Sequence, residues 1–406
     1  MPGLLPQVDP DGLLEYSVVY TDRALNHMSQ KFQGVMRDIS RLLKAVYHAR
    51  SAIVVPGSGT FGMEAVARQF ATGKKCLVIR NGWFSYRWTQ IFEMGSIPAE
   101  STVLKARRLT DQHQAAFAPA PINEVVAAIH AQRPDLVFAP HVETAAGMIL
   151  PDDYLRAVAD AVHAVGGLFV LDCIASGAIW VDMAATGVDV LVSAPQKGWS
   201  GPPCCALVML SEAARARIDA TSSTSFAADL KKWLQIMETY EAGGHAYHAT
   251  LPTDALTRVR DVMLETQAHG FEIARAQQQA LGDAVRALLE RKGFKSVAAA
   301  GFKAPGVVVS YTDDAGLHSS KTFLGLGLQT ATGVPLMCDE PADFKTFRIG
   351  LFGLDKLANI ERSVAHLEHA LSQVGLPTEP LAPAAPAAAA AAAGVATAVA
   401  AVPATA

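Results

Sequence analysis

Short apolar segments alternate with amphipathic helical segments between about residues 30 and 210. Apolar strands of this length, separated by helices, are typical of a mostly parallel sheet that is covered on both faces. This part of the chain is therefore predicted to form an α/β domain. The predicted strands are 51–55, 75–80, 135–139, 167–171, 188–193 and 206–210, and the predicted helices include 60–70, 122–132 and 151–165.

The pattern changes from about Leu256 onward. A long helical stretch with few breakers covers 256–292, and strand-like segments follow at 307–311 and 347–352. A closing helix is expected at 355–374. Helices gathered beside a few strands predict a smaller α+β domain.

The length of 406 residues exceeds that of most single domains, so two domains are expected. The last stretch consists almost entirely of Ala, Pro, Val and Thr and has too few large side chains to build a core. We therefore expect it to be disordered. The predicted division is an N-terminal segment 1–29, a large domain 30–255, a small domain 256–376 and a tail 377–406.

Charge and cysteine content argue against several classes of protein. The net charge is -4 and no basic block occurs, so no nucleic-acid partner is expected. The five cysteines include no CxxC pair, and the adjacent Cys204 and Cys205 are poorly placed to bridge each other. We expect reduced thiols and no metal site. With no signal peptide and no long apolar run in the body of the chain, a cytoplasmic protein without a membrane partner is predicted.

The segment Pro56-Gly57-Ser58-Gly59-Thr60 lies between a predicted strand and a predicted helix. Glycines let the backbone approach an anion, and a helix N-terminus offers free N–H groups and a positive dipole end. The hydroxyls of Ser58 and Thr60 add donors. This pattern predicts a phosphate cradle that is neither a Walker loop nor a GxGxxG turn. An ordinary strand-to-helix turn is the alternative.

Two ionisable residues follow neighbouring predicted strands. Asp172 ends the apolar run GLFVL, where a carboxylate can pair with a protonated heterocycle nitrogen. Lys197 comes shortly after the run VDVLVS, and a lysine becomes a nucleophile when burial or nearby cations lower its pKa. The alternatives are a helix-capping or surface aspartate and a solvated lysine.

Asp172, the strand after it and the turn Ser-x-x-Gln-Lys together resemble the class-V aminotransferases, which are fold type I pyridoxal-phosphate enzymes. Within that family the chain is similar to the alanine–glyoxylate and serine–pyruvate aminotransferases, over roughly residues 26–375. The resemblance implies a mostly parallel seven-stranded sheet and pyridoxal 5′-phosphate bound to Lys197 as a Schiff base. It also implies transfer of an amino group from a small amino acid to an oxoacid such as glyoxylate or pyruvate. Asp172 would keep the cofactor ring cationic.

The resemblance also implies roles for other residues in holding the cofactor. Ser58, Gly59 and Thr60 would hold its phosphate. Phe84, in a segment similar to the family's NGxW motif, would stack on the ring, with the adjacent Trp83 as a competitor. The remaining contacts would come from Thr144 in HVETAAG, which would bond the phenolic oxygen, and from Gln196.

Three further segments resemble substrate-binding or intersubunit motifs. Tyr247 and Thr250 match residues that reach the phosphate of a neighbouring subunit, which implies a homodimer with shared active sites. Arg348, in FRIGLFG, matches the arginine that binds the substrate carboxylate bidentately. His27 matches a residue near the substrate entrance. A surface or core-edge arginine and a packed histidine are the alternatives.

The chain departs from the family pattern near its start, where Asn26 replaces a glycine and the GPxxV opening is missing. Because this region builds the substrate side of the pocket, an atypical amino donor is possible. A lyase or cysteine desulfurase of the same fold is the nearest alternative, with Cys338 as its candidate nucleophile. The other is a regulator or scaffold that keeps the fold without the chemistry.

Overall fold

The computed structural model describes residues 8–9 and 11–374; the predicted tail 377–406 lies outside this part. A seven-stranded sheet has the order β1-β11-β10-β9-β6-β2-β3. Strand β11 runs antiparallel to both of its neighbours, whereas the pairs from β10 to β3 are parallel. The strands are β1 (Ser51–Pro56), β2 (Lys75–Arg80), β3 (Glu100–Lys105), β6 (Leu136–Pro140), β9 (Leu168–Asp172), β10 (Val190–Ser193) and β11 (Cys205–Leu210).

The predicted α/β fold with a mostly parallel seven-stranded sheet is confirmed. All six predicted strands form in this sheet, and the sequence prediction missed only β3. Every residue of β6, β9, β10 and β11 is buried, as expected for strands covered on both faces.

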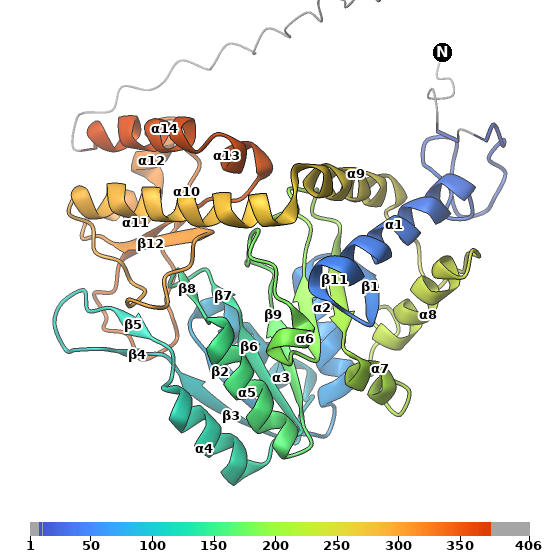
Figure 1. The fold of residues 1–406 in the computed structure, drawn as a ribbon, viewed down its shortest axis with the longest axis horizontal. Coiled ribbons are helices and arrows are strands. Elements are labelled where there is room, and N and C mark those ends of the chain that lie inside the picture. Colours follow the sequence, from blue (N-terminus) through green and yellow to red (C-terminus); the bar gives the residue numbers. More distant parts are fainter. Residues whose placement is uncertain (1–7, 10, 375–406) are drawn as a thin grey trace, which may run out of the picture.

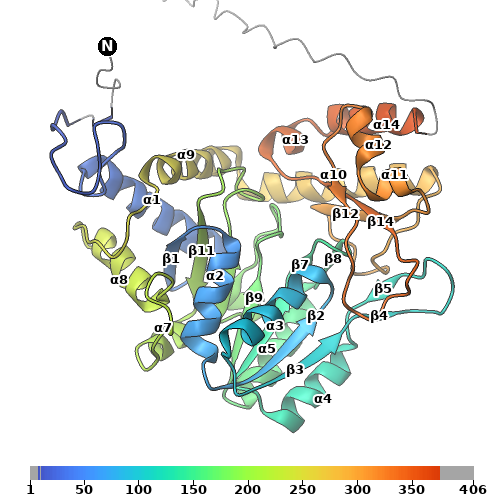
Figure 2. The same cartoon turned by 180° about the vertical axis from the view of Figure 1, so that it is seen from behind.

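Helices cover both faces of the sheet. Helix α5 (Asp152–Ala164) lies in front of it in Figure 1, whereas α2 (Gly59–Val66) and α3 (Trp83–Gly95) lie in front of it in the reverse view of Figure 2. Helix α2 approaches β11 so closely that a Cβ at Gly62 would lie 2.4 Å from Ala206 Cβ. The other helices before residue 250 are α1 (Gln30–Tyr47), α4 (Ile122–Gln132), α6 (Met183–Thr186), α7 (Glu212–Ile218) and α8 (Leu230–Glu241).

Three predicted helices are interrupted. The stretch 256–292 forms two helices because Gly270, with φ of 102°, separates them. The closing helix likewise divides at Asn359, and the predicted helix 60–70 continues beyond Val66 only as a π-helical turn. The segments are α9 (Thr253–His269), α10 (Phe271–Arg291), α13 (Leu354–Ala358), α14 (Ile360–Ser372) and η1 (Ala67–Ala71).

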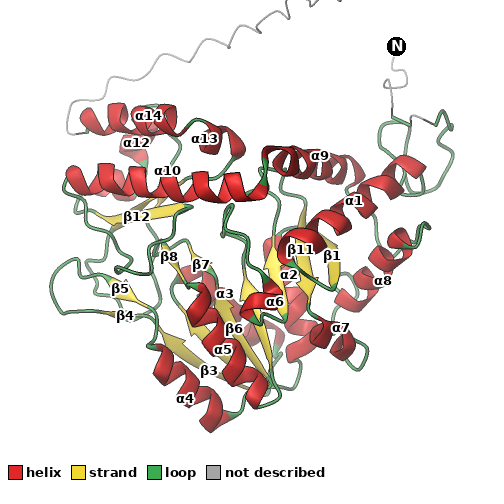
Figure 3. Ribbon diagram, in the orientation of Figure 1, coloured by secondary structure: helices red, strands yellow, loops and turns green. Residues whose placement is uncertain are grey.

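A second sheet, of order β12-β14-β13, follows the two long helices in sequence and is antiparallel. Figure 3 shows helices α10 and α14 stacked beside it. Its strands are β12 (Val307–Tyr311), β13 (Ala331–Thr332) and β14 (Thr346–Gly350), and the short helices nearby are α11 (Ala315–His318) and α12 (Lys321–Gly325). Two small hairpins pair β4 (Arg107–Arg108) with β5 (Phe117–Ala118), and β7 (Val142–Glu143) with β8 (Met148–Ile149).

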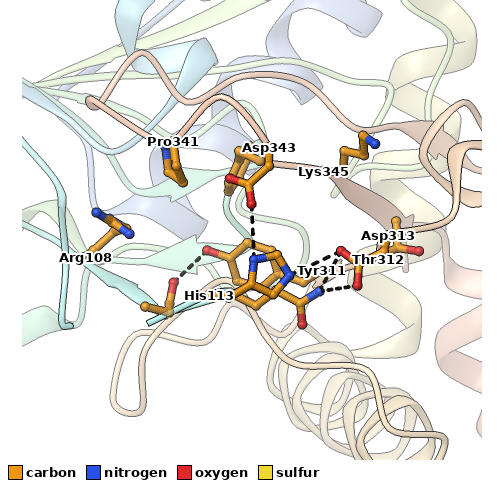
Figure 4. A pocket seen from close by; sticks show the side chains of 11 residues that line it. Arg108, His113, Tyr311, Thr312, Asp313, Pro341, Asp343 and Lys345 are labelled. Carbon is orange, nitrogen blue, oxygen red and sulfur yellow. Dashed lines mark hydrogen bonds and ion pairs between the residues drawn. The ribbon is translucent and has the colours of Figure 1, made fainter. Parts of the chain in front are cut away.

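The loop between β4 and β5 contacts the segments that precede and follow the strands of the second sheet. The two ring nitrogens of His113 lie 3.3 Å from Asp313 and 3.2 Å from Asp343, and the Tyr311 hydroxyl donates to the Ala115 carbonyl at 2.6 Å (Figure 4). This loop and the region of the second sheet are thus joined by polar contacts. None of the helices described is long and apolar enough to cross a membrane.

Candidate active site

A cavity of about 110 Å³ lies where the chain leaves the carboxyl ends of several strands of the large sheet. This is where open α/β sheets bind ligands, because the loops after parallel strands meet there. The cavity brings together most of the residues predicted to hold a cofactor. Its lining comprises Ser58, Gly59, Thr60, Met63, Phe84, Arg87, Val142, Thr144, Asp172, Ile174, Ala175, Gln196 and Lys197.

The cradle after β1 is shaped by glycine. Gly57 has φ of 121°, a backbone conformation that residues other than glycine rarely adopt. A Cβ at this position would also lie 2.7 Å from the Phe61 ring. Helix α2 begins two residues later, and Ser58 makes no side-chain hydrogen bond that caps it. The N–H groups of the first helical turn and two hydroxyls therefore remain available to an anion at the cavity wall.

Asp172 ends strand β9 with its side chain buried. Its Oδ1 accepts a hydrogen bond from the Ile174 N–H at 2.9 Å. Burial raises the pKa of Asp172 to about 6, although this hydrogen bond and the nearby Lys197 act in the opposite direction. A cation in the cavity would stabilise the ionised form of this buried carboxylate.

Lys197 reaches the same cavity from the loop after β10. Burial lowers the pKa of its ammonium group, and the neighbouring Asp172 partly offsets this effect. Its Nζ lies 6.0 Å from the centroid of the Phe84 ring and 5.9 Å from that of Phe352. The surroundings favour a neutral amine more than water does, as a nucleophilic lysine requires.

Of the two candidate aromatic residues, Phe84 faces the cavity. Trp83 does not line it, and its ring packs against that of Tyr86 with the centroids 5.8 Å apart. The geometry therefore favours Phe84 as the ring that contacts a bound aromatic group.

Glu143 supports the site although sequence reasoning did not single it out. Its carboxylate is fully buried and accepts hydrogen bonds from the N–H groups of Phe84 and Ser85 at 3.3 and 2.9 Å. These are N–H groups of the first turn of α3, where a negative charge is favourable. Gly82 permits this approach, because a Cβ there would lie 2.7 Å from Glu143 Cγ.

Arg87 is a second residue that the prediction missed. It lies three positions after Phe84 on helix α3, so both side chains project from one face of the helix. It lines the cavity, and its Nη1 donates to Thr60 Oγ1 at 3.0 Å. The helical spacing from Phe84 is the signal that could have identified it.

Arg348 approaches the site from strand β14. Its Cζ lies 5.5 Å from the Phe84 ring centroid, and its Nε donates to the Thr332 carbonyl at 2.7 Å. Burial lowers the pKa of Arg348, and no carboxylate of the described residues forms an ion pair with it. Its remaining guanidinium N–H groups are available for an anionic ligand.

Four predicted residues do not line this cavity: Arg348, which lies close to it, and three residues that lie together elsewhere. The ring centroids of His27 and Tyr247 are 5.6 Å apart, and the Tyr247 hydroxyl lies 3.1 Å from Thr250 Oγ1. His27 is buried and burial lowers its pKa, whereas Tyr247 is 53% exposed. None of the three lines the cavity that holds Lys197. They form a separate cluster in which the segment around His27 meets the segment 247–250.

The model of the family described as "Aminotransferase class-V" matches residues 12–327. The chain belongs to the class-V aminotransferase family. Aminotransferases of this class depend on pyridoxal 5′-phosphate, and the chain is accordingly a pyridoxal-phosphate-dependent aminotransferase.

Individual proteins similar to this class-V aminotransferase carry different names. A soluble hydrogenase small subunit of Synechococcus sp. is 26% identical, over 86% of this chain and 88% of that protein. A 2-aminoethylphosphonate–pyruvate transaminase of Paraburkholderia xenovorans is 26% identical, over 87% of this chain and 90% of that protein. The crystal structure of an alanine–glyoxylate aminotransferase from Nostoc sp. superposes with a TM-score of 0.71 at 20% identity. The superposition covers 85% of this chain and 88% of the Nostoc chain.

The cavity of this aminotransferase fits the cofactor of its family in chemistry. An anion cradle, a buried carboxylate and a buried amine line one cavity, as a phosphate, a ring nitrogen and an aldehyde require. The cradle also needs a small residue on its inner side, because a Cβ at Gly59 would lie 2.6 Å from Ile174 Cδ1.

Proposed function

We propose that this aminotransferase moves the amino group of a small amino acid to an oxoacid such as glyoxylate or pyruvate, with Lys197 as the residue that attaches the cofactor. The observation that carries this proposal is the meeting of Lys197, Asp172 and the 57–60 cradle in one cavity. The names of a pyruvate transaminase relative and a glyoxylate aminotransferase neighbour support the class of acceptor.

When bound, pyridoxal 5′-phosphate supplies an electron sink that stabilises negative charge at the substrate Cα. Asp172 would supply the carboxylate that keeps the ring nitrogen protonated. Lys197 would attach the cofactor, and its Nζ, whose pKa burial lowers, would serve as the base that accepts the proton from the substrate Cα. Arg348 binds the substrate carboxylate and thereby orients the Cα–H bond. Thr144, Gln196 and Phe84 line the same cavity; the two polar residues would hold the cofactor by hydrogen bonds, and Phe84 would supply an aromatic contact.

We also propose that the active enzyme is a homodimer in which each protomer completes the other's site. Tyr247 and Thr250 present hydroxyls on the surface, away from the Lys197 cavity of their own chain. His27 packs against Tyr247, so the three residues would enter the partner's site as one unit. The cysteines described are all free, which supports the proposed cytoplasmic location.

The desulfurase alternative needs an exposed and reactive cysteine, and Cys338 does not have this character. Its side chain is 4% exposed, and its thiol donates to the Arg80 carbonyl at 3.4 Å. Burial raises its pKa to about 12, which opposes formation of the thiolate. No observation favours the alternative of a regulator without chemistry, because the cavity keeps both Asp172 and Lys197.

Purified protein supplied with pyridoxal 5′-phosphate tests the proposal. We expect the yellow absorbance of cofactor attached to lysine, and ping-pong kinetics when alanine, serine and aspartate are offered with glyoxylate or pyruvate. Chromatography of the amino acid and oxoacid products identifies the reaction. Release of sulfide from cysteine with no amino transfer to either oxoacid would contradict it.

A further inference from the structure

Arg87 occupies the side of the cavity that faces the anion cradle. Its Nη1 donates to Thr60 Oγ1 at 3.0 Å, and its Cζ lies 5.3 Å from the centroid of the Phe84 ring. Helix α3 therefore carries an aromatic face and a guanidinium group one turn apart, both directed at the same cavity. The cradle and the guanidinium belong to different elements, at the start of α2 and on α3, and the hydrogen bond from Arg87 to Thr60 joins them.

Arg87 is near enough to Asp172 for its charge to lower the pKa of that carboxyl, but it has no direct ionic partner among the described residues. No carboxylate among them forms an ion pair with it, whereas many arginines on the surface of this chain do form such pairs. Its contact with Thr60 is a hydrogen bond to a neutral hydroxyl. A half-buried guanidinium beside free helix N–H groups is a favourable partner for a doubly charged phosphate.

We propose that Arg87 is the cationic partner of the cofactor's phosphate, so that helix α2 and helix α3 hold the anion from two sides. This inference rests on the proposed function and names a residue that the family motifs in the sequence did not. Arg348 is left for the substrate carboxylate, because its Nε is fixed to strand β13 through Thr332. Arg87 instead touches the cradle itself, which is the observation that separates the two guanidinium groups.

Arg87→Gln and Arg87→Lys variants of the cofactor-free protein test this assignment. Their dissociation constants are measured by absorbance and fluorescence titration with pyridoxal 5′-phosphate and with pyridoxal, which lacks the phosphate. We expect Arg87→Gln to weaken binding of the phosphorylated form about 10- to 100-fold, since a hydrogen bond to a charged group is lost, and to leave pyridoxal nearly unchanged. Arg87→Lys should recover part of the loss.

Inorganic phosphate provides a readout that needs neither cofactor nor turnover. Phosphate should raise the thermal unfolding midpoint of the cofactor-free wild type, because a ligand that binds only the folded state stabilises it. The same titration should leave the midpoint of Arg87→Gln nearly unchanged. Circular dichroism and the midpoint without phosphate show whether the variant folds as the wild type does.

Arg348→Gln is the matched control, since it removes a guanidinium at a similar distance from Phe84. It should preserve the preference for the phosphorylated form and raise the KM for the oxoacid. If Arg87→Gln instead keeps that preference and raises the substrate KM, Arg87 binds substrate and the inference is overturned. A wild type that binds neither ligand would overturn the proposed function, whereas wild-type binding with an unchanged preference in Arg87→Gln overturns this inference alone.

Discussion

The carboxylate of Glu143 holds Ser85 by two hydrogen bonds, one from the backbone N–H at 2.9 Å and one from Oγ at 2.7 Å. Ser85 lies in the first turn of helix α3, between the two residues that project into the cavity, Phe84 and Arg87. Glu143 does not line the cavity but fixes the helix that forms its wall.

Replacing Glu143 by Gln tests this positioning role. The substitution keeps the shape but turns an amide NH2 toward N–H donors, so we expect the free energy of unfolding to fall by about 1–3 kcal/mol. Urea unfolding measures the change. Affinity for pyridoxal 5′-phosphate should fall as well, and Glu124→Gln serves as the control because Glu124 pairs with Arg107 on the surface. An unchanged midpoint for Glu143→Gln would contradict the assigned role.

Lys197→Ala should abolish the covalent attachment of the cofactor. The yellow absorbance of attached cofactor should disappear after gel filtration, and amino transfer should fall by at least about 10²-fold, because a positioned general base contributes this much or more. Lys197→Arg keeps a positive charge but provides no amine for attachment, and it should be equally inactive. Retained absorbance in either variant would assign the attachment to another lysine.

Asp172 should give the cofactor-free protein a distinct pH dependence. Because burial raises its pKa from 3.8 to about 6, the folded chain binds this proton more tightly than the unfolded chain between about pH 4 and 6. The contribution of Asp172 to the free energy of unfolding therefore falls as the pH rises through this window, by about 3 kcal/mol. The Asp172→Asn variant has no ionisable group at this position, so its free energy of unfolding should not show this fall.

Urea unfolding of both cofactor-free proteins at pH 4 and pH 7 isolates the effect of Asp172. The variant should gain stability relative to the wild type as the pH rises. With cofactor present, the wild type should be more stable than the variant at pH 7, because the variant has no carboxylate to pair with the ring nitrogen. A difference between the two proteins that stays constant from pH 4 to pH 7 would show that Asp172 does not titrate there.

The shared active site can be tested by mixing two inactive proteins. One carries Lys197→Ala and the other carries Tyr247→Phe with Thr250→Val. In a mixed dimer one site receives both defects and the other receives none, so random assortment of equal amounts should restore about one quarter of the wild-type sites. Amino transfer before and after exchange of subunits measures the recovery. Sites contained within single protomers would give no recovery beyond the sum of the parents.

The strands of the large sheet were predictable because their burial on both faces produces continuous apolar runs. Strand β3 was missed because it lies at the sheet edge, where Glu100 and Ser101 are exposed and the apolar run is lost. The break at Gly270 was missed for another reason. A single glycine is tolerated inside helices, and only packing of the two helices against different neighbours decides that the chain turns there.

The residues that hold the site were predictable where they follow strands in recognisable motifs, as Asp172 and Lys197 do. Glu143 lies in such a motif, yet its partner Ser85 is 58 positions away, and its function as a helix cap depends on that long-range contact. Arg87 was missed because an arginine on a helix is usually solvated, and only the cavity shows that this one faces inward.

Among the described residues, β1 is an edge strand of the large sheet and pairs with β11 alone, from Ser51 opposite Leu210 to Pro56 opposite Cys205. The proposed phosphate cradle follows β1 directly, so part of its support comes from a strand about 150 positions later in the chain. During synthesis β1 cannot form this pairing until β11 has left the ribosome. A nascent chain that ends before residue 205 lacks the strand that pairs with β1, so we expect cofactor binding to be a late event in the folding of this enzyme.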